Sequence, residues 1–191
     1  DFSGKSFDLN KMHSSVTYSI RNSSFSGFDI RNSAGKIYFA DNNIDLNINH
    51  SSSAGNIRVS GKVNISDMKN PAYSLKGKAQ HLNISALTKN IEDKSDLNFS
   101  FNVKGRGIDL KDINGNYNLD IENSYFAGNN IPRTPLNIEI KNTGGYSSYV
   151  LSSDIIDFTA KGNFNIGSVS SVISGNIGMI SEKFKDKLFP D

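Results

Sequence analysis

Apolar and polar residues alternate with a period of two along most of this 191-residue chain. Residues 44–49 read Ile-Asp-Leu-Asn-Ile-Asn, and residues 97–103 read Leu-Asn-Phe-Ser-Phe-Asn-Val without an exception. Because successive side chains of a strand point to opposite faces, each such segment has one apolar and one polar face. The pattern predicts an all-β, mainly antiparallel protein with about twelve to fourteen short strands and one sheet face in water.

The apolar members of these segments are the candidate residues of a continuous apolar face. They are Ile44, Leu46, Ile48, Ile57, Val59, Val63, Ile65, Leu75, Leu97, Phe99, Phe101, Val103, Tyr117, Leu119, Ile121, Leu136, Ile138, Ile140, Phe158, Phe164 and Ile166. Alternation identifies the face, but it leaves open whether the side chains fill a closed core or line an open groove. For any single position, ordinary core is the more common interpretation.

Two segments depart from the alternation and predict helix. Residues 85–90 fit a short helical turn between two strands. Residues 168–188 carry apolar side chains at spacings of three and four, which predicts a C-terminal helix. Gly175 and Gly178 weaken that helix by about 1 kcal/mol each relative to Ala.

Several glycines fall in phase with the apolar positions: Gly61, Gly77, Gly105, Gly115 and Gly162. Glycine inside a strand usually marks a bulge, a bend or the close approach of another group. We expect Gly61 and Gly77 to bend the sheet toward its apolar face. Gly105 and Gly115 fit a hairpin turn equally well.

Composition agrees with a one-faced sheet. The chain holds 25 Asn and 28 Ser, more than a quarter of its residues, and the alternation places most of them opposite Ile, Leu and Phe. Its 21 Lys and Arg against 19 Asp and Glu are scattered, so no cluster predicts a nucleic-acid partner. Cysteine is absent, which excludes disulfides and thiolate zinc sites.

The domain organisation predicted is one β-segment spanning residues 1–191, with 1–70 and 71–191 as possible sub-units. No apolar run approaches the roughly 20 residues that span a bilayer. The first residue is Asp1 instead of Met, so we expect the chain to be part of a longer protein.

No constellation of catalytic or metal-binding residues emerges. His13, His50 and His81 lie far apart in the sequence, and we expect them to be exposed. The segment from Asp41 begins like a calcium loop, but Leu46 stands where such a loop needs glycine. With no nucleophile, base and orienting group in a recognisable arrangement, we expect neither an enzyme nor a cofactor.

Three stretches together resemble a known superfamily. They are residues 72–87 (AYSLKGKAQHLNISAL), residues 96–131 with a G-x-G-x-x-L-x-x-I-x-G core from Gly105 to Gly115, and residues 158–166 (FTAKGNFNI). The chain is similar here to the AsmA-like superfamily and, within it, to TamB-like proteins of the Gram-negative envelope. The resemblance covers about residues 72–188, and residues 1–71 share only the alternation.

The resemblance implies an elongated, curved, taco-like or U-shaped sheet with a hydrophobic concave face. It implies a periplasmic location in a longer chain anchored in the inner membrane. Such proteins are implicated in shielding phospholipid acyl chains between the two membranes. TamB-like members are also implicated in outer-membrane protein assembly with a BamA-family barrel partner.

Two other hypotheses fit the alternation. The first is a structural or adhesive β-sandwich or β-solenoid surface module whose core is filled by its own side chains. The second is a chaperone-like sheet edge that accepts outer-membrane strands by β-augmentation. A filled core, or cross-linking along an edge strand, would distinguish these from a lipid-binding groove.

Overall fold

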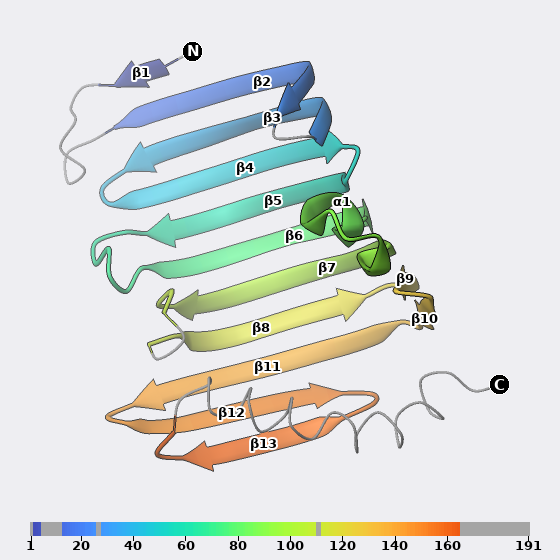
Figure 1. Cartoon of the computed structure of the whole chain (residues 1–191). Coiled ribbons are helices and arrows are strands. Elements are labelled where there is room, and N and C mark those ends of the chain that lie inside the picture. Colours follow the sequence, from blue (N-terminus) through green and yellow to red (C-terminus); the bar gives the residue numbers. More distant parts are fainter. Residues whose placement is uncertain (1, 5–12, 26–27, 110–111, 165–191) are drawn as a thin grey trace.

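A computed structural model describes residues 2–4, 13–25, 28–109 and 112–164 of the chain. Within these ranges the protein is almost entirely antiparallel β-sheet, with one short α-helix and one short 3-10 helix. The strands follow one another across the molecule nearly in sequence order (Figure 1). The all-β prediction is therefore confirmed. The predicted helix at 168–188 lies outside the described residues.

The main sheet pairs eleven of the described strands in the order β1-β2-β3-β4-β5-β6-β7-β8-β11-β12-β13. Their bounds are β1 Phe2–Gly4, β2 Ser14–Phe25, β3 Phe28–Ala40, β4 Asn43–Ser52, β5 Gly55–Asn64, β6 Ala72–Leu82, β7 Ser95–Arg106, β8 Asn114–Ile121, β11 Thr134–Thr143, β12 Tyr146–Ser153 and β13 Asp157–Gly162. A small hairpin of β9 (Ser124–Phe126) and β10 (Asn129–Ile131) separates β8 from β11 in sequence and pairs with the start of β7. The result is an open meander.

The predicted helical turn is present as α1, Ile84–Thr88, followed by the 3-10 helix η1, Ile91–Asp93. Asn83 caps the N-terminus of α1, because its side-chain oxygen accepts a hydrogen bond from the Ser85 amide. The same oxygen accepts from the Ser95 amide at the start of β7. None of the described helices is long and apolar enough to cross a membrane.

The sheet continues across residue 70, the boundary between the two possible sub-units. Strands β5 and β6 pair from Asn64 opposite Ala72 to Asn56 opposite Gln80. The described elements contact one another mainly as neighbouring strands of this sheet. The architecture is therefore essentially one layer, and this arrangement determines the character of its two faces.

Candidate functional site

Strand pairing brings the alternating apolar residues into rows that cross the sheet. One row contains Val16, Ile37, Leu46, Gly61, Leu75, Val103, Tyr117, Ile138, Leu151 and Phe158. A second row, two residues along each strand, contains Tyr18, Gly35, Ile48, Val59, Gly77, Phe101, Leu119 and Leu136. Because side chains two positions apart share a face, these rows form one surface, which we call the apolar face.

Two outer rows complete the apolar face. One contains Ser14, Phe39, Ile44, Val63, Tyr73, Gly105, Gly115, Ile140, Tyr149 and Ala160. The other contains Ile20, Ser33, His50, Ile57, Ala79, Phe99, Ile121 and Thr134.

The structure places 18 of the 21 predicted residues on this face within strands. Ile65 and Phe164 lie just beyond the ends of β5 and β13, and Ile166 lies outside the described residues. Sequence reasoning missed three strands whose residues form these rows, β2, β3 and β12. Val16, Tyr18 and Ile20 alternate with polar residues in β2, so β2 could have been found from the sequence. Leu151 was hidden because it follows Val150, which faces the other side beside Glu139.

Most of the apolar face is only partly buried. Of the 20 predicted residues that the structure describes, only Ile140 is buried, at 6% exposure. The other buried hydrophobic residues of the described chain are Ala54, Ala79 and Tyr149. A sheet packed against a second layer would bury many large side chains completely. Among the described residues, no second layer covers this face.

Buried hydroxyl groups border the apolar face. Ser14 and Thr134 stand at the ends of the outer rows given above, Ser33 lies one strand in, and each is less than 7% exposed. Most serines were expected on the polar face, and Ser14 and Ser33 are exceptions. Thr134 donates to the Pro132 carbonyl at 2.9 Å, and the Ser33 hydroxyl lies 3.4 Å from that of Tyr18. The Ser14 hydroxyl has no hydrogen-bond partner among the described residues.

Glycines on the apolar face make room for aromatic rings from the neighbouring strand. A Cβ on Gly77 would lie 2.5 Å from Cζ of Phe101, which pairs directly opposite it. Gly105 and Gly115 pair with each other inside β7 and β8, so the hairpin-turn interpretation of these two glycines is wrong. Gly105 and Gly115 share an outer row, Gly35 and Gly77 share the second row, and Gly61 lies in the first.

A pair of tyrosines is the central polar feature of the apolar face. The hydroxyls of Tyr73 and Tyr117 form a hydrogen bond of 2.7 Å above the glycine pair. Burial and then this hydrogen bond raise the pKa of Tyr117 above its ordinary value of about 10. The Tyr117 hydroxyl therefore stays neutral at physiological pH, which keeps its charge off this part of the face.

The opposite face is polar and carries the exposed ion pairs. Its central row contains Thr17, Lys36, Asn47, Ser60, Lys76, Asn102, Asn118, Asn137, Ser152 and Asp157. Arg133 donates two hydrogen bonds to Asp120, at 2.8 and 3.1 Å. These hydrogen bonds lower the pKa of the Asp120 carboxyl group below its ordinary value. Exposed pairs of this kind contribute little to stability.

The histidines are not gathered into a metal site. His13 lies 3.3 Å from Asp41, and His81 lies 3.0 Å from Asp96, both at the surface. His50 was expected to be exposed, but it is half-buried in an outer row of the apolar face. No group of three metal-ligating side chains occurs within the described ranges.

Comparison with known proteins adds no relative. No family model matches the chain, and no curated protein or solved structure matches it. The candidate site therefore rests on the chain's own residues: an apolar, largely uncharged face that no described element covers, with hydroxyl groups along its margins.

Proposed function

We propose that the apolar face shields the acyl chains of phospholipids. The observation that supports this function is that most side chains of four adjacent rows keep part of their apolar surface exposed across the described strands. Leaving so much aliphatic and aromatic surface in water is unfavourable, and each methylene group buried on it contributes about 0.8 kcal/mol. Acyl chains need shape and apolarity instead of specific polar partners, which suits a face without a catalytic constellation.

The resemblance to AsmA-like and TamB-like proteins supplies the cellular setting of the proposal. We place the chain in the periplasm of a Gram-negative bacterium, as a module that carries lipid between the inner and outer membranes. Support of outer-membrane protein assembly with a BamA-family partner belongs to the same proposal. Eleven strands at a spacing of about 4.8 Å give an apolar surface roughly 50 Å long.

Photo-cross-linking from neighbouring positions tests the proposal directly. Leu119 lies on the apolar face of β8, whereas Asn118 lies on the polar face of the same strand. Benzoylphenylalanine is placed at either position, and the protein is incubated with vesicles of radiolabelled phosphatidylethanolamine and phosphatidylglycerol. We expect lipid adducts from position 119 and at most one tenth as many from position 118.

Two results would count against the function. Equal labelling from both positions would mean nonspecific association with vesicles. An absence of lipid adducts, together with a polypeptide adduct from position 119, would mean that protein covers the face, as in a self-filled structural module.

A further inference from the structure

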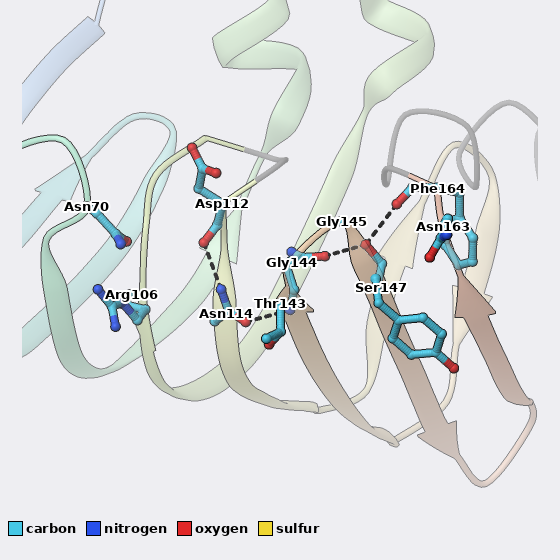
Figure 2. Close-up of a pocket in the computed structure, with 12 residues that line it drawn as sticks. Asn70, Arg106, Asp112, Asn114, Thr143, Gly144, Gly145, Ser147, Asn163 and Phe164 are labelled. Carbon is cyan, nitrogen blue, oxygen red and sulfur yellow. Dashed lines mark hydrogen bonds between the residues drawn. The ribbon is translucent and has the colours of Figure 1, made fainter.

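A polar pocket of about 800 Å³ lies where the ends of β7, β8, β11, β12 and β13 meet. In Figure 2, Asn70 and Arg106 lie on one side of the pocket and Asn163 and Phe164 on the other, with Asp112 and Asn114 between them. The pocket is therefore built from loops and strand ends that are far apart in the sequence.

Some side chains of the pocket lining hold the strand ends together through hydrogen bonds. Asn142 donates from its amide nitrogen to the Ile113 carbonyl at 2.6 Å, and its side-chain oxygen accepts from the hydroxyls of Ser147 and Tyr149. Asn114 accepts from the Asn142 backbone amide at 2.6 Å. These side chains are structural, because their hydrogen-bonding groups already have partners (Figure 2).

Three other side chains in the pocket lining carry charged or polar groups that are not paired among the described residues. Arg106 and Asp112 are exposed, and neither side chain makes an ion pair within the described residues, including with the other. The side-chain oxygen of Asn70 is buried and has no hydrogen-bond partner. That oxygen is closed to solvent, so it is not open to a ligand. The charged groups that the pocket presents to a ligand are therefore the Arg106 guanidinium and the Asp112 carboxylate, neither of which makes an ion pair among the described residues.

The pocket adjoins the apolar face at one end. Asn142, Ser147 and Gly162 form the next row after Ile140, Tyr149 and Ala160 on the same side of the sheet. The ring of Phe164, in the pocket lining, lies 5.7 Å from the ring of Tyr149 on the face. A molecule in the pocket can therefore extend directly onto the apolar surface.

Exposed apolar side chains surround the same end of the sheet. Met68 is 66% exposed in the loop that carries Asn70, and Ile108 is 73% exposed between Arg106 and Asp112. Tyr146, in the lining itself, is 51% exposed. Apolar groups around a charged pocket favour an amphipathic ligand over a free sugar or inorganic phosphate.

We propose that this pocket binds the headgroup of a zwitterionic glycerophospholipid whose acyl chains lie on the apolar face. The proposal rests on the function proposed above and names its substrate class. The guanidinium of Arg106 binds the phosphate, for which its planar donor groups are suited. The ammonium group of the headgroup donates to the Asp112 carboxylate.

Headgroup competition tests the proposal. The protein with benzoylphenylalanine at position 119 is labelled with radioactive phosphatidylethanolamine, while unlabelled lipids with the same acyl chains compete. We expect phosphatidylethanolamine to compete about tenfold better than diacylglycerol or phosphatidylglycerol, as a hydrogen bond to a charged group predicts. Free glycerophosphoethanolamine, lacking acyl chains, should compete at least tenfold less well.

Variants separate the two ends of the headgroup. Arg106→Gln should remove most of the advantage over diacylglycerol, and Asp112→Asn should remove the advantage over phosphatidylglycerol. Lys104→Gln is the matched control, since Lys104 lies two residues before Arg106 in β7 but does not line the pocket. It should leave the competition unchanged, and thermal unfolding midpoints should show that all three variants fold.

The outcomes distinguish this inference from the proposed function. Lipid labelling that is the same for every headgroup and unchanged in Arg106→Gln and Asp112→Asn would overturn the headgroup site alone. Equal competition by free glycerophosphoethanolamine would also overturn it, in favour of a site for soluble phosphoesters. Failure of every lipid to label position 119 would instead overturn the acyl-chain function.

Discussion

At the scale of single residues, the tyrosine pair shows how the apolar face accommodates polar atoms. Tyr73 and Tyr117 come from strands separated by β7, and each satisfies the other's hydroxyl at 2.7 Å. Burying a hydroxyl without a partner would cost about 1–3 kcal/mol. Their mutual hydrogen bond therefore allows two tyrosines to occupy an apolar surface without introducing charge.

The Tyr73→Phe variant should lower the pKa of Tyr117. Burial remains, but the second cause of the upward shift, the hydrogen bond between Tyr117 and Tyr73, is lost. Because the folded-state pKa exceeds the unfolded value near 10, the contribution of Tyr117 to stability is complete below pH 10 and falls as pH rises above it. Ultraviolet titration of tyrosinate formation measures the shift.

Tyr18→Phe serves as the control for this titration. It removes a hydroxyl that lies 3.4 Å from the Ser33 hydroxyl elsewhere on the same face. We expect it to leave the titration of Tyr117 unchanged. An identical Tyr117 titration in the Tyr73→Phe variant would contradict the role of the hydrogen bond.

At the scale of strands, glycines act in two different ways. At Gly35 the closest neighbour of an added Cβ would be a side-chain atom, Cε1 of Tyr18 at 2.6 Å, with the Asn47 carbonyl oxygen farther away at 3.1 Å. Gly61 has φ = +150° in β5, and an added Cβ would collide with the backbone carbonyl of Ser74 in β6. The first is a packing constraint, and the second is a backbone constraint that no rotamer change relieves.

Alanine substitutions should separate these two constraints. Gly35→Ala should reduce the free energy of unfolding by about 1–3 kcal/mol through overpacking, and less than about 1 kcal/mol when Tyr18→Ala has already removed the ring. Gly61→Ala should cost at least as much with or without Tyr18→Ala. Urea denaturation of the single and double variants measures both values. Additive effects at positions 18 and 35 would refute the packing explanation.

Strand existence and face were predictable, whereas pairing details were not. The alternation at residues 97–103 is sufficient to place Leu97, Phe99 and Phe101 on one face, because it depends only on the geometry of one strand. The opposition of Gly105 and Gly115 depends on how two strands align. That alignment also decides which aromatic ring covers which glycine.

At the scale of the whole molecule, the sheet resembles a repeat protein in its energetics. Each described strand is stabilised mainly by its neighbours in the meander. Stability in such an arrangement is close to a sum of neighbour terms, so unfolding can begin at an end. β6 has strands on both sides, whereas β13 has β12 as its single described neighbour.

Hydrogen exchange should therefore be graded along the sheet. We expect backbone amides of β13 to exchange about tenfold or more faster than those of β6 under native conditions, since opening β13 breaks one interface instead of two. Mass spectrometry of peptic fragments, with β7 as an interior reference, measures the gradient. Equal protection of β13 and β6 would indicate a layer or partner that covers the end of the sheet.

The candidate pocket was not predictable from the sequence. Arg106 and Asp112 looked like isolated charges in a chain whose charges are scattered, and Asn70 was one of 25 asparagines. Only the antiparallel meander brings the loop after β5, the β7–β8 connection and the β11–β12 turn to one end of the sheet.

The sequence by itself determined the fold class and which side chains share a face, because period-two alternation acts within each strand and needs no distant contact. The tertiary structure decided whether that face is covered, which glycines lie under aromatic rings and where free polar groups converge. Those features depend on register and on the number of layers, both set by contacts between segments that are distant in the chain. Alternation is the same for a filled core and for an open apolar surface, so only the arrangement of the strands could distinguish them.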